Sequence, residues 1–403
     1  MKTKLTFFLC ICLTAAVTGS CVRVDGSDPY EKDLHRLSVS LVLPESYGGD
    51  LSGTEVSVVN VNDDSSYGAV ADASGVAVIS LPNGLYRVSV GALVEGERFN
   101  GSRSGIVLNG QDVSEVLNLK RSSTSDIVIK EIYSGGCMKL PAEGTYQSDS
   151  YIVLHNNSEK TVYLDSLCFG TLDPYNSNGI SVWDEGIDFC PVCQAIWQFP
   201  GDGKSFPLEK GQDAVIAVFG AIDHTAQYPL SVNLNREDVF TCYSPTYFPN
   251  TAYHPAPGDK VRPERYLNVV IKTGQSNAYT FSISSPAVIF FKTRGMSAQE
   301  FVASPDNVVY KPGTSRERIV KVPVDWVLDG VEVFNGQSSV NKKRLGAEVD
   351  AGYVTLSNVH EGRSVMRLRN ESRSEKLGFE VLTDTNNSSY DFYERDTQGL
   401  KDE

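Results

Sequence analysis

The stretch GVAVISLPNGLYRVSVGALV, residues 75–94, alternates apolar and polar side chains in two runs that a Pro-Asn-Gly turn separates. A side-chain period of two is typical of a β-strand with one buried face, and Pro, Asn and Gly between such runs indicate a tight turn. Three nearby runs share the alternation: LSVSLVLP (37–44), TEVSVVNV (54–61) and SEVLNLK (114–120). Residues 37–121 are therefore predicted to form an antiparallel β-sandwich.

A second region, residues 126–395, follows the short polar linker RSSTS (121–125). It contains no long amphipathic helix pattern, and the stretch SAQEFVASPDN (297–307) favours a short helical turn at most. Long loops rich in Pro and Tyr separate its apolar runs. The predicted fold class is therefore all-β, with a smaller sandwich followed by a larger one and then a charged tail over residues 396–403.

The first region resembles the prealbumin-like modules related to carboxypeptidase regulatory domains. The resemblance lies in ADASGVAVISLPNGLYRVSVGA (71–92), where Asp72–Gly75 and Leu81–Gly84 correspond to turns, and Tyr86 and Val88 to the following strand. Such modules are usually spacers, so the resemblance implies that this sandwich is a folded stalk.

The second region is similar to a family of Bacteroidetes outer-membrane lipoproteins of unknown function, with motifs that look like those of lamin-tail-type sandwiches. Four stretches carry the resemblance: DSYIVLHNNSEKTVYLDSLCFG (149–170), FPGDGKSFPLEKGQDAVIAVFGAIDHT (199–225), VPVDWVLDGVEVF (322–334) and DTNNSSYDFY (384–393). It implies a lipid-anchored β-sandwich in a family often associated with TonB-dependent uptake systems. It carries over no catalytic residue.

Residues 1–20, MKTKLTFFLCICLTAAVTGS, have the pattern of a secretory signal, because two lysines precede an apolar run too short to span a bilayer. Cys21 follows the small residues Gly19 and Ser20, which resembles a bacterial lipoprotein signal and implies lipidation of Cys21. An ordinary cleaved signal with an incidental cysteine is the alternative. Val22 in place of Asp favours the outer membrane, on either its periplasmic or its surface side, and residues 21–36 are expected to form a flexible tether.

The overall charge is acidic, with 36 basic and 50 acidic residues and a formal net charge of −14. Such a surface repels phosphate backbones, and no basic stripe stands out along the sequence. Nucleic acid is therefore not expected as a partner.

Cys190 and Cys193 have the spacing of thioredoxin-like redox sites, zinc sites and short disulfides alike. A redox site requires a sizeable helix after the first cysteine, and Pro200 and Gly201 leave room for two turns at most. A zinc site requires about four ligands, whereas the other cysteines are scattered and the nearest histidine is His224. Metal binding therefore remains an alternative only if the fold brings such residues together. The prediction is that Cys190 and Cys193 take part in structural disulfides in an oxidising compartment.

Motifs of catalysis and of nucleotide or calcium binding are lacking. Gly203-Lys204-Ser205 has no glycine five residues upstream, so it predicts a turn and not a phosphate-binding loop. No Gly-x-Ser-x-Gly or His-Glu-x-x-His motif occurs. The acidic loops at 60–66 and 384–391 lack the ligand spacing of known calcium loops and favour turns that bond their own backbone. The chain is therefore predicted not to be an enzyme and to hold no metal or cofactor.

The stretch TCYSPTYFPNTAYHPAPGDKVRPERYL (241–267) concentrates aromatic rings among prolines. A proline-stiffened loop loses little entropy on binding, and exposed rings can stack on a glycan, a peptide or a flat cofactor. The alternative is that the rings cover one end of the sandwich. The candidate ligand-binding residues are Tyr243, Tyr247, Phe248, Tyr253 and His254, and at least two of their rings are expected to be exposed if the loop binds a ligand.

Together these inferences predict that the protein is lipid-anchored, non-enzymatic and located at the outer membrane. The leading hypothesis is an accessory or ligand-binding component that works with a TonB-dependent transporter in nutrient uptake. The alternative is a structural or adhesive, fimbria-like surface subunit.

Overall fold

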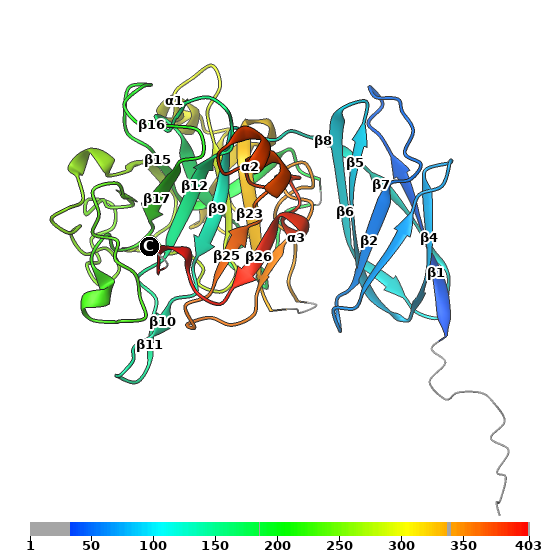
Figure 1. Ribbon diagram of the computed structural model, residues 1–403, viewed down its shortest axis with the longest axis horizontal. Coiled ribbons are helices and arrows are strands. Elements are labelled where there is room, and N and C mark those ends of the chain that lie inside the picture. The colour runs from blue at the N-terminus through cyan, green and yellow to red at the C-terminus, as the bar shows by residue number, and fades with distance from the viewer. Residues whose placement is uncertain (1–32, 185, 337–339, 402–403) are drawn as a thin grey trace, which may run out of the picture.

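The computed structural model describes residues 33–184, 186–336 and 340–401, which form two β-sandwiches that lie side by side (Figure 1). The predicted signal at residues 1–20, Cys21 and most of the predicted tether lie outside the described residues. The all-β prediction is confirmed, because sheets dominate both domains.

The first domain consists of two sheets that enclose one core. The smaller sheet has the order β4 (Val76–Pro82), β1 (Leu34–Val42), β7 (Val113–Asn118), and the larger has the order β3 (Ser66–Val70), β2 (Glu55–Asn60), β5 (Gly84–Val94), β6 (Glu97–Leu108), β8 (Lys120–Ser122). Alternate residues of β1, namely Leu37, Val39 and Leu41, point into the core, as the period of two predicts. The predicted boundaries of 37 and 121 differ slightly from the strands, which begin at Leu34 and end at Ser122.

The second domain is built on two larger sheets. One has the order β18 (Phe240–Thr241), β17 (Asp213–Ala217), β12 (Tyr151–Asn156), β9 (Ile127–Tyr133), β25 (Ser364–Arg367), β26 (Phe392–Arg395). The other has the order β21 (Val308–Tyr310), β22 (Arg318–Pro323), β15 (Phe189–Gln198), β14 (Cys168–Leu172), β20 (Ala287–Phe291), β23 (Val327–Asn335), β24 (Val354–Leu356), and β19 (Asn268–Lys272) also pairs with β15.

Small elements complete the second domain. Two short ribbons pair β10 (Cys137–Met138) with β11 (Thr145–Tyr146), and β13 (Val162–Tyr163) with β16 (Pro207–Leu208). The α-helices are α1 (Ala298–Ala303), α2 (Glu371–Leu377) and α3 (Ser388–Asp391), and the 3-10 turns are η1 (His224–Ala226), η2 (Pro263–Arg265), η3 (Val324–Trp326) and η4 (Gly399–Lys401). The helical turn predicted within 297–307 is confirmed as α1, which begins with a capping box between Ser297 and Glu300.

Three apolar clusters stabilise the second domain. The largest lies between the two sheets and contains Trp197 and Phe290. A second includes Phe301 of α1, whose ring centroid lies 4.7 Å from that of Trp326, and a third is centred on Tyr133 and Tyr151. Strands between such clusters are covered on both faces, and all six residues of β12 are buried.

Arg367 of β25 is buried beside three aspartates. Its guanidinium nitrogens lie 2.6 Å from Asp329, 3.2 Å from Asp384 and 3.5 Å from Asp391. Burial raises the pKa of Asp329 to about 7 and that of Asp391 to about 6, although Arg367 acts in the opposite direction. The network ties β23 to β25, to α3 and to the segment before α3.

The loop at 384–391 joins the two domains. The Asn386 amide donates to Ser122 Oγ at 2.5 Å and to the Ser123 carbonyl at 3.1 Å, and the Asn100 amide of β6 donates to the Thr385 carbonyl at 2.9 Å. The loop also bonds its own backbone, since Thr385 N donates to Asp391 at 2.8 Å. The predicted turn is therefore confirmed, and we call residues 384–391 the latch.

Arg87 of β5 forms a second link between the domains. It is buried, and its guanidinium carbon lies 4.4 Å from the ring centroid of Tyr353 and 5.1 Å from that of Phe334. The two rings stack with centroids 4.3 Å apart. A buried cation–π contact of this kind contributes on the order of 2 kcal/mol. The latch and Arg87 together oppose separation of the two sandwiches.

The C-terminal residues 396–401, which lie in the predicted charged tail over 396–403, pack on the second domain. Gln398 is buried and donates to the Leu230 carbonyl at 3.1 Å. Gly399 N donates to the buried Glu131 carboxyl at 2.7 Å. These bonds satisfy polar groups of the domain, so residues 396–401 belong to it.

Candidate functional site

The aromatic insert is mostly part of the core. Phe248 and His254 are each 2% exposed, and the Phe248 ring packs 5.5 Å from that of Trp197 between centroids. Burial lowers the pKa of His254, whose ring bonds the Tyr279 carbonyl. The prediction that Phe248 and His254 contact a ligand is therefore wrong, because their rings fill the end of the sandwich.

The other rings of the insert do not form a shared exposed surface. Tyr243 is half-buried and packs edge-on against Tyr266, with ring centroids 5.5 Å apart. Tyr253 is half-buried against the main core beside Phe219. Tyr247, at 42% exposure, is the one ring of the five candidates that is exposed. The alternative interpretation, in which the rings cover the sandwich, is the one that agrees with the structure.

Cys190 and Cys193 do not form a disulfide, and the prediction of one is wrong. Both lie on β15, and in an extended strand residues three apart point to opposite faces with Cα atoms about 10 Å apart. Cys190 packs in the apolar cluster beside α1, whereas Cys193 Sγ lies 3.8 Å from Thr171 Oγ1. All five cysteines in the described part of the chain are free thiols. Burial raises the pKa of Cys190 and of Cys193 to about 12, so both stay protonated.

A buried polar cluster lies behind the β10–β11 ribbon. It brings together Cys137, Asp149, His224 and Ser231, residue types that can support nucleophilic catalysis. Ser231 Oγ donates to Asp149 at 2.5 Å, while His224 Nε2 bonds the Gly220 carbonyl at 2.7 Å and Nδ1 bonds the Tyr146 hydroxyl at 2.6 Å.

The chemistry of this cluster favours a structural role. Burial and then the Asp149 charge raise the pKa of the Cys137 thiol to about 12, so the thiolate needed for attack is scarce. Burial also lowers the pKa of His224. Both ring nitrogens of His224 are occupied, Nδ1 by the Tyr146 hydroxyl of β11 and Nε2 by the Gly220 carbonyl.

His155, Asp213 and Glu380 place ligand atoms within 4.8 Å of one another, as a metal site would. The Lys130 ammonium lies between the two carboxylates, at 2.6 Å from each. His155 Nδ1 lies 2.6 Å from Asp213, and its Nε2 lies 3.0 Å from the Glu380 carbonyl. Because an ammonium supplies the positive charge that a metal would supply, this cluster is explained as an ion-pair network.

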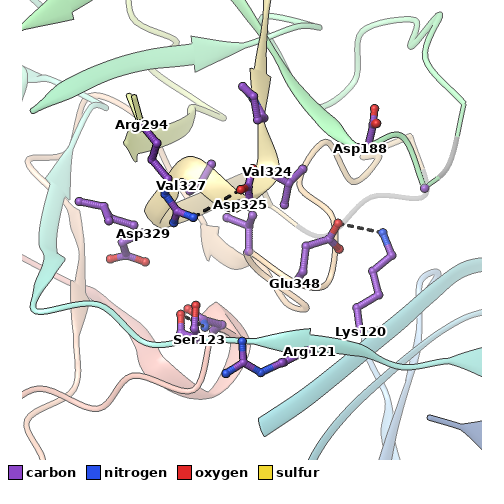
Figure 2. Close-up of a pocket in the computed structure, with 15 residues that line it drawn as sticks. Lys120, Arg121, Ser123, Asp188, Arg294, Val324, Asp325, Val327, Asp329 and Glu348 are labelled. Atoms are coloured by element: carbon purple, nitrogen blue, oxygen red, sulfur yellow. Dashed lines mark hydrogen bonds and ion pairs between the residues drawn. The ribbon is translucent and has the colours of Figure 1, made fainter. Parts of the chain in front are cut away.

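Two cavities of about 630 Å³ each lie where the domains meet. The first is shown in Figure 2, where Lys120 pairs with Glu348 at 2.8 Å and Arg294 pairs with Asp325 at 3.4 Å. Its lining mixes cations with carboxylates that pair with them. It therefore presents little unbalanced charge to a ligand.

The second cavity has a different lining, and we call it the basic groove. Its cations outnumber its carboxylates, although the chain as a whole is acidic. The cations are Arg87, Arg103, Lys120, Lys342, Lys343 and Arg344, and the carboxylates are Asp173 and Asp184. Two aromatic residues, Trp183 and Phe189, also line it.

The basic groove was not predicted from the sequence, because its cations come from segments that are far apart. Arg87 and Arg103 lie on β5 and β6 of the first domain, and Lys120 begins β8. The run Lys342-Lys343-Arg344 was the available signal, since three consecutive basic residues are conspicuous in an acidic chain.

The comparisons with known proteins support the fold. The model of the family described as "Protein of unknown function (DUF4876)" matches residues 209–399, and no curated protein matches the chain. A crystal structure of a DUF4876 family protein from Bacteroides thetaiotaomicron VPI-5482 is similar at 24% identity and a TM-score of 0.58, over 89% of this chain and 94% of that one.

A DUF3823 family protein from Parabacteroides merdae ATCC 43184 is 10% identical, with a TM-score of 0.16 over 35% of this chain and 67% of that one. That score supports no structural conclusion. The resemblance of the second region to a Bacteroidetes family of unknown function is confirmed, because residues 209–399 match the DUF4876 family model and the similar crystal structure is of a DUF4876 protein from a Bacteroides species.

Proposed function

We propose that this protein is a lipid-anchored, non-enzymatic component of the outer membrane that binds a small ligand in the basic groove for a TonB-dependent uptake system. The observation that carries the proposal is a cavity of about 630 Å³ lined by residues of both domains. Ligand sites are frequent at domain interfaces, and volumes of roughly 300–1,000 Å³ suit small molecules.

The contacts around the basic groove favour a preformed site. Arg87 lies in the wall of the groove and is held by the rings of Tyr353 and Phe334. Asn386 of the latch donates to Ser122 and Ser123, which follow closely after the groove residue Lys120 in the sequence. Walls that are already fixed lose less conformational entropy when a ligand binds.

The proposed anchor is the lipid on Cys21, as the signal-like residues 1–20 suggest. Among the described residues, no helix is both long enough and apolar enough to cross a membrane. A diacylated cysteine would supply membrane affinity through its buried methylene groups.

Replacing Cys21 by Ser is expected to move the protein from the membrane fraction to the soluble fraction and to abolish palmitate labelling, because the acyl chains would be lost. Fractionation of cells followed by immunoblotting measures the change. Cys12→Ser, which alters a cysteine inside the apolar run, serves as the matched control and should leave the protein in the membrane. A Cys21→Ser protein that still sediments and labels like the unaltered protein would refute the anchor.

The proposed partner is tested by chemical cross-linking in intact cells, followed by purification of the full chain from solubilised membranes. A TonB-dependent transporter should be the main cross-linked protein, and the yield should fall for Cys21→Ser. Recovery of fimbrial subunits in its place would support the structural or adhesive alternative.

A further inference from the structure

We propose that the basic groove binds a ring-bearing organic anion of small-molecule size, such as an acidic or phosphorylated sugar. This inference rests on the proposed role of the groove as a ligand site. It goes further by assigning the anionic part of the ligand to the cations of the groove and the ring to Trp183.

The positive charge of the basic groove is only partly cancelled by carboxylates, although Lys120 lies 2.8 Å from Glu348 and Arg103 lies 3.7 Å from Glu115. Lys343 and Arg344 share one buried partner, Glu332, at 2.9 Å and 2.8 Å. Arg87 is held by two aromatic rings, and the described residues place no carboxylate within ion-pair distance of Lys342, which is exposed. An excess of cations in a low-dielectric cleft focuses the field and raises the local concentration of anions.

The lysine and arginine at 343 and 344 are fixed in position. Arg344 also donates to the carbonyls of Ser285 at 3.0 Å and Pro174 at 3.2 Å. The position of Arg344 in the groove wall is therefore fixed by the second domain, and its guanidinium contributes a fixed positive charge to the groove. Lys342 is exposed, so it is the cation best placed to pair directly with a ligand.

Trp183 supplies a preoriented ring. Its indole Nε1 donates to Asp173 at 2.9 Å, and Asp173 is held in turn by Lys311 at 2.7 Å. The indole meets Phe189 edge-on, with centroids 5.7 Å apart, and stays half-exposed in the groove lining. A half-exposed indole whose polar edge is already bonded leaves an apolar surface for a ligand ring.

The combination of the two features selects the ligand class. Cations alone would hold any anion, and an indole alone would hold any flat ring. Together in one cavity of about 630 Å³ they favour a molecule that carries both groups. Galacturonate oligomers and sugar phosphates share this chemistry and differ in the anionic group.

The test is isothermal titration calorimetry on the full chain with digalacturonate, glucose 6-phosphate and the neutral sugar maltose, in buffer of low ionic strength. At least one anionic probe should bind with a Kd below about 1 mM. Its affinity should fall as salt is added, because the contact is partly electrostatic. Maltose should bind at least about tenfold more weakly.

Two groove variants and two matched controls locate the binding. Lys342→Glu and Trp183→Ala should each weaken binding of the anionic probe by about tenfold or more. Lys376→Glu, an exposed lysine of α2, and Tyr247→Ala, an exposed ring of the aromatic insert, should leave it unchanged. Circular dichroism checks that every variant is folded.

Three results would overturn the proposal. Failure of both anionic probes to bind would reject the ligand class, while the anchor and transporter experiments would still decide the proposed function separately. If maltose binds as tightly as the anionic probes or more tightly, and Trp183→Ala abolishes that binding, the groove remains the site but the proposed preference for an anionic ligand is rejected. Binding that neither groove variant weakens would reject the groove itself.

Discussion

Replacing Arg367 by Met is expected to lower the free energy of unfolding by about 3–5 kcal/mol at pH 7.5, because it leaves three buried carboxyls without their cation. Arg367 contacts Asp329, Asp384 and Asp391 within 3.5 Å. The pKa values of Asp329 and Asp391 are already raised, to about 7 and about 6, and loss of Arg367 would raise them further.

This loss should depend on pH in a definite direction. A carboxyl whose pKa is higher in the folded than in the unfolded protein destabilises the fold as pH rises through that range, since the unfolded chain releases its proton first. The deficit of Arg367→Met should therefore shrink as the pH is lowered from 7.5 towards 5. Urea unfolding at several pH values measures it.

Arg363→Met is the matched control, because Arg363 makes ion pairs with Glu361 and Asp396 near the surface. It should cost less than about 1 kcal/mol. Equal costs for the two variants, or a deficit of Arg367→Met that grows at low pH, would contradict the proposed role of the network.

Replacing Phe248 by Ala is expected to cost about 3–5 kcal/mol of stability, although Phe248 lies in the loop that sequence composition marks as a ligand site. Its ring is buried against Trp197 and Tyr279, with centroid distances of 5.5 and 5.9 Å. Tyr247→Ala, one residue earlier and exposed, should change stability by about 0.5 kcal/mol or less. Denaturant unfolding of both variants provides the comparison, and a Phe248→Ala protein as stable as Tyr247→Ala would show that the insert is not part of the core.

The first domain could be predicted well because each of its sheets has one face on a single core, while most of the other face is exposed or only partly covered. Val56 and Val58 of β2 are buried while their neighbours are more exposed, and the sequence shows this alternation directly. The second domain gave weaker signals because its strands lie between several cores. In β12 all six residues are buried, so no period of two marks its faces.

The candidate site was harder to predict for a different reason. The aromatic content of a loop does not show whether its rings are exposed, and the rings of Phe248 and His254 are buried. The spacing of Cys190 and Cys193 suggested a disulfide, whereas β15 is extended there and separates the two thiols. The basic groove arises only when the fold brings β5, β6 and β8 against residues 341–347.

The latch shows what a short polar motif can and cannot reveal. Its Asp and Asn residues predicted a turn that bonds its own backbone, and Thr385 N bonds Asp391 as expected. The contacts of Asn386 with Ser122 and Ser123 join residues more than two hundred and fifty positions apart, as only the folded chain can.

We propose that the ligand site lies in the basic groove between the domains and not in the aromatic insert. Hydrogen exchange of the full chain, with and without saturating digalacturonate, tests it most directly, because a bound ligand slows exchange of the backbone amides that it covers or stabilises. Binding in the groove should slow exchange in segments 102–105, 186–191 and 341–347, with no change in 243–254. Protection confined to 243–254, with none in the three groove segments, would contradict it.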